Sequence, residues 1–403
     1  MVYAYGCIDI ILRRDAFADR GLKLIRKSEV DERHFDDDLI CVRGGMSPMD
    51  TESSVRYLEF RYGITIFDLT DQEHPKAVDG AVVSGPFGLT TECSWLKHNS
   101  YGGWEMEKYR DRGEMVMWDS KAWVEQFGMA RESRDWGLSS ELRRAVFEHT
   151  KKVVQEGGYE IDGSWVDIGQ SPASTWFCDE LKVRGEGSYE TVFEVVNEDC
   201  LATARRLAGE NPLVLNMASR STPGGGVEGG AGAQEECLFR ASNYYTTLYP
   251  LQDVAYPMDR NFGGIYSPEV TVFRGLEAEG YPLLKEPFKV SFVAVAALNG
   301  PHLTPSGDYT ESERLGMLNK IRTILNIALK FGHKTLVLSA FGCGAFRNPP
   351  EKVALLFKEV FEEPAYKGAF EKVVFAIKGD HNDWRNANFE AFRRVIEPTL
   401  TLK

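Results

Sequence analysis

From about residue 190 to the end of the chain, short apolar runs alternate with glycine-rich turns and helix-like stretches. Runs typical of buried strands lie at residues 190–196, 213–215, 290–297 and 372–379. A long amphipathic stretch at residues 311–332 ends on Gly332 and predicts a helix. This order of strands, turns and helices predicts a layered α/β domain.

Two glycine-rich turns directly follow apolar runs, at residues 224–232 and 342–344. Ligands of open α/β sheets bind outside the carboxyl ends of the strands. We therefore expect the two turns to lie at the same edge of the sheet and to share one ligand.

The first turn contains three consecutive glycines and is followed by Gln234, Glu235 and Glu236. Glycines let the backbone take positive φ and let its N–H groups approach phosphate oxygens. Two adjacent carboxylates offer a general acid/base and a partner for hydroxyl groups, and cleavage of a sugar bond uses both. The alternative is a glycine linker before an ordinary helix start, where acidic residues are favoured.

The full string around this turn resembles the signature of bacterial-type poly(ADP-ribose) glycohydrolases, in which GGG is followed by a short linker and QEE. Here seven residues, Val227 to Ala233, form that linker. The flanking strings LNMAS and ECLFRASNYY are also similar. The resemblance weakens away from the signature and covers about residues 138–403. It implies a macrodomain-like, three-layer α/β/α domain that hydrolyses ribose–ribose O-glycosidic bonds in poly(ADP-ribose) and releases ADP-ribose.

The resemblance also implies roles for individual residues. Glu236 would protonate the leaving ribose oxygen and then activate a water against an oxocarbenium-like centre. Glu235 would hold ribose hydroxyls, and Gln234 would orient the pair. A carboxyl group that donates and then accepts a proton works best with a raised pKa, which burial beside a second carboxylate could supply. The other expected contacts with the scissile ribose are Asn216, Gly224, Gly225, Gly226 and Val227.

The second turn would wrap the diphosphate of the substrate, because its glycines permit close approach of the backbone. Phe346 matches an aromatic residue that packs on the ribose in the family, although a place in the core is the alternative. Adenine would lie near Asn197 to Cys200, where Asp199 either reads the base or simply caps a helix. The expected contacts in this turn are Ser339, Gly342, Cys343, Gly344, Ala345 and Phe346. Relatives often have Phe where this chain has Val227, a difference that could alter the fit of the substrate.

Residues 1–130 contain short strands separated by turns and predict a smaller α+β domain. Arg43 ends one apolar run, and Thr90 and Thr91 lie in a later GLTTE string. This arrangement weakly resembles mono-ADP-ribosyltransferase toxins, in which an arginine and a Ser/Thr strand bind NAD and a glutamate assists transfer. Glu105 or Glu107 would then be that glutamate. The alternative is that Arg43 is structural and the threonines belong to an ordinary strand.

Residues 128–137 are polar with glycine near both ends, and they predict a boundary between domains at 1–130 and 138–403. A helix is expected after it, capped by Ser139 or Ser140 and ended by Gly157. His149 lies in this helix and is expected to be structural.

The net charge of −13 argues against broad binding of a nucleic-acid backbone. The seven cysteines include no CxxC or Cys/His cluster, so neither a disulfide framework nor a metal site is indicated. No apolar run is long enough to span a membrane, and no secretory signal is evident. These features predict a cytoplasmic protein, or a nuclear one in a eukaryote, that acts on poly(ADP-ribose) or ADP-ribosylated macromolecules without a cofactor.

Two other functions remain open at this point. A binding macrodomain would recognise ADP-ribose without cleaving it, but such a reader has no need of the Glu235–Glu236 pair. A bifunctional protein would use its N-terminal domain to transfer ADP-ribose, and NAD would then be its cofactor.

Overall fold

The computed structural model describes residues 118–379 and 386–397, together with the backbone of four short strands nearer the N-terminus. The chain divides into two compact units, residues 1–117 and 118–403. In the first unit, β1 (Cys7–Arg13) pairs antiparallel with β2 (Leu39–Gly45), and β3 (Phe67–Asp68) with β4 (Lys76–Ala77). Arg43 lies within β2. Thr90, Thr91, Glu105 and Glu107 lie outside the described residues, so the role of this unit stays a prediction.

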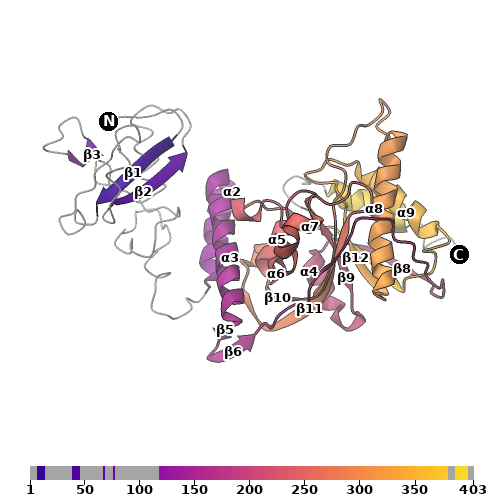
Figure 1. Ribbon diagram of the computed structural model, residues 1–403, viewed down its shortest axis with the longest axis horizontal. Coiled ribbons are helices and arrows are strands. Elements are labelled where there is room, and N and C mark those ends of the chain that lie inside the picture. The colour runs from indigo at the N-terminus through magenta and orange to yellow at the C-terminus, as the bar shows by residue number, and fades with distance from the viewer. Residues whose placement is uncertain are drawn as a thin grey trace. The chain divides into compact units, whose positions relative to one another are not determined.

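A seven-stranded sheet forms the centre of the second unit, in the order β7-β10-β11-β9-β12-β13-β8 (Figure 1). The neighbours from β11 to β8 pair in parallel, and β10 and then β7 extend the sheet by antiparallel pairing. A small hairpin, β5 (Gly158–Ile161) with β6 (Ser164–Asp167), lies outside this sheet. The strands of the sheet are β7 (Thr175–Phe177), β8 (Val192–Val196), β9 (Leu213–Met217), β10 (Gly264–Arg274), β11 (Leu283–Val295), β12 (Thr335–Leu338) and β13 (Lys372–Ala376).

Helices cover both faces of the sheet, so the predicted three-layer α/β/α architecture is confirmed (Figure 1). One face carries α8 (Glu311–Lys330), α9 (Pro350–Glu362) and α10 (Ala387–Ile396). The other face carries α3 (Trp136–Glu156), α4 (Cys200–Arg206), α5 (Gln234–Ala241), α6 (Tyr245–Leu248) and α7 (Gln252–Ala255).

The alternation of side chains along β9 decides which face holds the site. Leu213 and Leu215 pack into the core under α8 and α9, whereas Val214 packs into the core under α4 and α5. Because successive side chains of a strand point to opposite faces, Asn216 lies on the same face as Val214. The strand therefore directs one polar side chain toward α5.

The two glycine-rich turns lie at the same edge of the sheet, as the sequence predicted. The first follows β9 and leads into α5, and the second follows β12 and leads into α9. β9 and β12 are adjacent and parallel, so their carboxyl ends meet at one rim.

The boundary predicted at residues 128–137 is not a linker. Helix α2 (Ser120–Glu132) continues through Gly128, and the second unit begins at Trp118. The side chain of Trp123 is buried, and its indole N–H donates to the carbonyl of Leu142 on α3 at 2.9 Å. The polar residues that suggested a linker are therefore the end of α2 and the short turn that leads directly into α3.

Helix α3 also begins earlier than predicted, at Trp136. Its N-cap is Asp135, whose carboxylate accepts from the Leu138 N–H at 2.9 Å, rather than Ser139 or Ser140. Gly157 ends the helix in the left-handed region at φ 80°, as expected. His149 is buried and its ring packs edge-on against Trp118, in keeping with a structural role.

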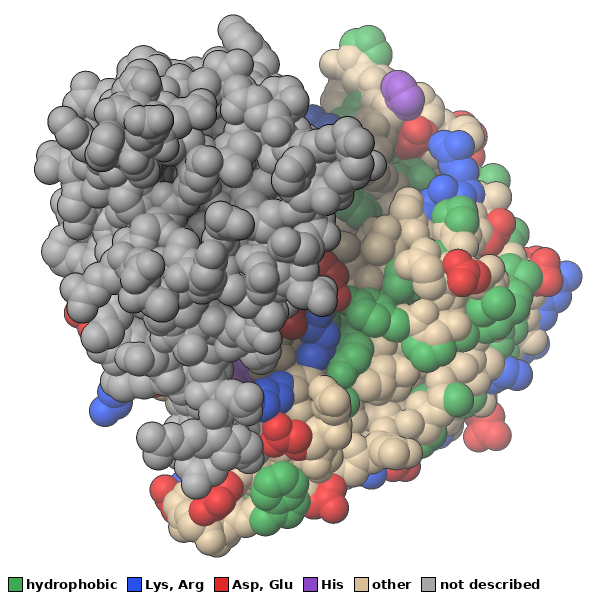
Figure 2. All heavy atoms as spheres, turned by 60° about the vertical axis from the view of Figure 1, so that its left-hand side comes forward, with side chains coloured by type: hydrophobic (Ala, Val, Ile, Leu, Met, Phe, Trp, Pro, Cys, Tyr) green, Lys and Arg blue, Asp and Glu red, His purple; other side chains and the backbone are tan. Residues whose placement is uncertain are grey.

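Charged side chains are intermixed on the surface of the second unit. Figure 2 shows acidic, basic and apolar side chains interspersed over one face, without a broad basic area. Among the described residues, no helix is long and apolar enough to cross a membrane.

Candidate active site

Glu235 and Glu236 lie in the first turn of α5, directly behind the triple glycine. Both are buried, with 3% and 6% of their surface exposed. The N-terminal end of a helix favours negative charge, which offsets part of the cost of burying two adjacent carboxyl groups. The pair therefore lies where the fold itself provides hydrogen-bond donors.

Glu235 accepts hydrogen bonds from three donors. Its Oε1 accepts from Asn216 Nδ2 at 3.3 Å and from the Gly224 N–H at 3.2 Å. Its Oε2 accepts from the Ser219 N–H at 2.7 Å. The end of β9, the turn and α5 are thus joined through one side chain.

Glu236 has one oxygen fixed and one without a protein partner. Oε1 accepts from the Gly226 N–H at 2.9 Å. Oε2 is buried and has no hydrogen-bond partner within the described part of the chain. A buried polar atom normally has a partner, so this oxygen marks where a substrate group can bind.

The triple glycine is needed for contacts within the protein as much as for a ligand. A Cβ at Gly225, where φ is +57°, would lie 2.5 Å from Oε1 of Glu236 and 3.2 Å from Oε2 of Glu235. A Cβ at Gly224 would lie 2.4 Å from the ring of Phe239. These glycines let the turn close onto the two carboxyl groups.

Asn216 and two tyrosines surround Glu235. Asn216 is fully buried, and its Nδ2 also donates to the hydroxyl of Tyr244 at 3.3 Å. Its Oδ1 and the hydroxyl of Tyr256 are buried without a partner among the described residues. Neither tyrosine was predicted from the sequence, where the only signal is the run of tyrosines between positions 244 and 256.

Gln234 does not contact the pair through its side chain, and its predicted role in orienting the pair stays a prediction. Its Nε2 donates to the carbonyl of Leu215 at 2.7 Å, and its Oε1 accepts from the Met217 N–H at 2.8 Å. Its side-chain amide pairs with the backbone of β9 as a neighbouring strand would, and it fixes the start of α5 against β9.

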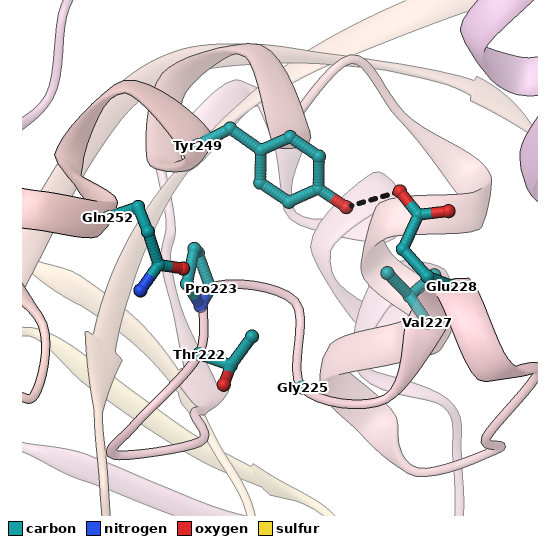
Figure 3. A pocket seen from close by; sticks show the side chains of 7 residues that line it. All are labelled: Thr222, Pro223, Gly225, Val227, Glu228, Tyr249 and Gln252. Carbon is teal, nitrogen blue, oxygen red and sulfur yellow. Dashed lines mark hydrogen bonds between the residues drawn. The ribbon is translucent and has the colours of Figure 1, made fainter.

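A cavity of about 340 Å³ opens beside the first turn (Figure 3). The hydroxyl of Tyr249 reaches across it to Oε1 of Glu228 at 3.0 Å. Val227 is buried under the turn, and Gly225 separates the cavity from Glu236. The cavity is lined by Thr222, Pro223, Gly225, Val227, Glu228, Tyr249 and Gln252.

The second turn is fixed by hydrogen bonds from the buried Asn348, whereas the tip of the turn is exposed. Asn348 is buried, and its Nδ2 donates to the carbonyls of Leu298 at 2.7 Å and Gly342 at 3.0 Å. At the tip, Gly344 and Ala345 are exposed. The backbone N–H groups of Gly344, Ala345 and Phe346 donate to no described residue. This turn can therefore offer several donors to one anion.

The remaining residues predicted for this region have structural contacts. The Ser339 hydroxyl donates to the Ala376 carbonyl at 2.8 Å. Cys343 and Phe346 are half-buried and pack against the core under α9, so the core alternative holds for part of the Phe346 ring. Asp199 caps α4 by accepting from the Leu201 N–H at 2.9 Å, which is the capping alternative.

Comparisons with known proteins place this geometry in a family. The family model for the catalytic domain of microbial-type PARG matches residues 148–275, which include the first turn and the Glu235–Glu236 pair. The crystal structure of poly(ADP-ribose) glycohydrolase from Thermomonospora curvata is 30% identical, with a TM-score of 0.52, and the match covers 63% of this chain and 99% of that chain. The same organism's enzyme bound to the inhibitor ADP-HPD is 30% identical, with a TM-score of 0.50, over 62% of this chain and 98% of that chain.

The chain belongs to the poly(ADP-ribose) glycohydrolase family. No match was found among curated proteins. Almost the whole length of the Thermomonospora glycohydrolase is matched, whereas over a third of this chain lies outside the match.

In this glycohydrolase, the pKa of Glu235 is raised. Burial raises the pKa of Glu235 to about 8, the charge of Glu236 adds to the shift, and the donors Ser219, Asn216 and Gly224 oppose it. The two carboxyl groups therefore differ in their surroundings: one is enclosed by donors, and the other keeps an oxygen for a ligand.

The raised pKa of Glu235 predicts how the stability of this glycohydrolase depends on pH. Between its ordinary value of 4.5 and about 8, the folded chain holds a proton that the unfolded chain has lost. The free energy of unfolding should therefore fall as pH rises through this window, by a few kcal/mol at most. Urea denaturation between about pH 5 and 8 measures this slope. Glu235→Gln should flatten it, and identical slopes in both proteins would contradict the assignment.

Proposed function

We propose that this chain hydrolyses ribose–ribose O-glycosidic bonds in poly(ADP-ribose), with Glu236 as the general acid/base, and releases ADP-ribose. The proposal rests on the hydrogen bonding of the two carboxyl oxygens of Glu236. One of its oxygens is fixed by the Gly226 N–H, and the other is buried without a protein partner next to Glu235.

The proposed reaction needs one proton carrier and one water. The carboxyl group of Glu236 gives a proton to the leaving ribose oxygen as the bond from that oxygen to the anomeric carbon breaks. Positive charge develops at the anomeric carbon and ring oxygen. A water then adds to this carbon and returns a proton to the Glu236 carboxylate. The net change is one water consumed, with one ADP-ribose and one free hydroxyl formed.

Glu235 and Asn216 would hold the ribose that is attacked. Glu235 is fixed by three donors, so it can accept from ribose hydroxyls without moving. The unpartnered Oδ1 of Asn216 is a second acceptor on the same side. Hydrogen bonds to ribose hydroxyls strengthen as charge develops on the sugar, which is where they contribute to the rate.

The diphosphate would bind the N–H groups of the second turn, because those of Gly344, Ala345 and Phe346 donate to no acceptor among the described residues. In the first turn, the N–H groups of Gly224 to Val227 already donate within the protein, so the second turn would supply the donors for the diphosphate. The adenine would lie toward Asp199, whose capping of α4 fixes the position of its carboxylate. The inhibitor ADP-HPD bound to the Thermomonospora enzyme supports a nucleotide ligand of this kind.

The direct test is incubation of the full chain with poly(ADP-ribose) labelled in its adenine. We expect free ADP-ribose to accumulate, measured by chromatography, while protein-bound polymer shortens. Retention of intact polymer by the protein, with no ADP-ribose released, would instead establish a binding macrodomain.

A further inference from the structure

Lys320 is a buried cation that the proposed reaction does not use. It lies on α8 with 2% of its surface exposed, on the apolar side of the helix with Met317 and Ile321. No carboxylate forms an ion pair with it in the described ranges. Buried lysines are rare without a partner, because removing the charge from water is costly.

Two exposed arginines lie within electrostatic reach of Lys320. Arg220 and Arg260 both oppose its charge, and neither forms an ion pair with a described residue. Burial, followed by these two arginines, lowers the pKa of Lys320 to about 8. Asp259 is the nearby carboxylate, and its Oδ1 accepts from the N–H groups of Asn261 at 2.8 Å and Phe262 at 2.7 Å. Lys320, Arg220 and Arg260 therefore form a cationic cluster whose three positive charges face one nearby carboxylate, that of Asp259.

The cluster adjoins the carboxylate pair through the backbone. Arg220 follows Ser219, whose N–H binds Glu235. The Arg220 carbonyl accepts from the Met258 N–H at 2.9 Å, which joins the first turn to the segment that carries Arg260. One turn after Lys320, the Thr323 methyl group packs at Gly264, the first residue of β10.

The order of strands places this cluster on the opposite side of the site from the second turn. β12 lies on one side of β9, whereas β11 and β10 lie on the other. Under the proposed function, the released ADP-ribose has its diphosphate on the β12 side and its ribose at β9. A polymer continuing past the broken bond would then reach the β10 and β11 side.

We propose that the exposed Arg220 and Arg260, with the charge of the buried Lys320 behind them, bind a phosphate group of the ADP-ribose unit on the leaving side of the scissile bond. This inference rests on the proposed function and extends it to a second subsite. A chain with a net charge of −13 repels a polyanion at long range, so a focused group of cations is needed to hold the polymer beside the carboxyl groups. Guanidinium groups pair well with phosphate oxygens, and the charge-assisted bonds are strong.

The test compares the double variant Arg220→Gln with Arg260→Gln against the natural chain. Both arginines are exposed, so the fold should not change. We expect KM for poly(ADP-ribose) to rise by about 10- to 100-fold, with kcat changed less than about threefold. The affinity for free ADP-ribose, measured by calorimetry, should stay the same. The salt dependence of polymer binding should weaken by roughly one to two units in slope.

Two further variants are needed: a control arginine away from the cluster, and a substitution of the buried Lys320. Arg184→Gln removes one positive charge, against two in the double variant, from an exposed position away from the cluster. Its neighbour Gly185 donates its N–H to the Ala365 carbonyl, in the segment that precedes β13. The Arg184→Gln variant should leave KM unchanged. Lys320→Met should raise KM for polymer while the Tm stays the same or increases, because an unpaired buried charge is removed. A merely structural lysine would instead lower the Tm and leave KM unchanged.

Failure of the leaving-side subsite can be distinguished from failure of the proposed hydrolysis. If the natural chain binds ADP-ribose but releases none from polymer, the proposed function fails. If it does release ADP-ribose and the double variant keeps its KM, the leaving-side subsite is wrong. Equal losses for polymer and free ADP-ribose would assign the cluster to the released unit and overturn the proposal. Loss of single-stranded DNA binding with unchanged polymer kinetics would make it a nucleic-acid site and also overturn it.

Discussion

Glu236→Gln should lower kcat for release of ADP-ribose from poly(ADP-ribose) by about 10³-fold, because general acid/base catalysis by one group contributes in that range. The amide can still accept from the Gly226 N–H, which now donates to Oε1 at 2.9 Å. The turn should therefore keep its shape, and affinity for ADP-ribose should change by less than about fivefold. Chromatography of released ADP-ribose and calorimetry of ADP-ribose binding measure the two effects.

Glu362→Gln is the control for this variant. It makes the same chemical change on the exposed side of α9, at the far end of the helix from the second turn. Its kinetics should match those of the natural chain. A Glu236→Gln protein that retains more than about a tenth of the natural kcat would rule out Glu236 as the proton carrier.

Gly225→Ala should lower kcat by about 100-fold through a movement of the same carboxyl group. The added Cβ would lie 2.5 Å from Oε1 of Glu236, and the backbone at φ +57° is unfavourable for a side chain. Either the turn or the carboxyl must shift, and a displacement near 1 Å at a reacting group costs about this much in rate. Steady-state kinetics on polymer, with the Tm recorded in parallel, measure the effect.

Gly229→Ala is the matched control in the same turn. Its backbone is outside the left-handed region, and a Cβ there would meet nothing within 4 Å. It should keep at least about half of the natural kcat and the natural Tm. Equal loss of activity in both variants would indicate that the turn needs flexibility rather than closeness to Glu236.

The strands that carry the site were predictable because they are buried on both faces. Leu213, Val214 and Leu215 are all fully buried in β9, and an uninterrupted apolar run is what such a strand requires. The rule that ligands bind at the carboxyl ends of parallel strands then placed both turns at one rim. The adjacency of β9 and β12 confirms that placement.

Other features depended on contacts between distant residues. The sequence around Gly128 suggests a linker, but the indole of Trp123 fixes α2 onto α3 through Leu142. Gln234 looks like a partner of the carboxyl pair, yet its amide completes the hydrogen bonds of β9. Neither pairing has a local signal, because the partners lie 17 to 19 residues apart in the sequence.

The glycines show how a correct prediction can have a different physical basis. Their absence of side chains predicts close approach of a ligand, whereas in the structure Gly224 and Gly225 first make room for Phe239 and the two carboxyl groups. The burial of Lys320, by contrast, was predictable from the sequence but was not predicted. A lysine between Met317 and Ile321 on an amphipathic helix lies on the apolar side, and such a charge calls for an explanation.

The most direct test of the account is a crystal structure of the Glu236→Gln protein with a short poly(ADP-ribose) oligomer. If residue 236 is the proton carrier, a glycosidic oxygen will lie within about 3.2 Å of its side-chain amide, and the adjacent diphosphate will bind the N–H groups of Gly344 to Phe346. An oligomer with every glycosidic oxygen more than about 6 Å from that side chain would contradict the account.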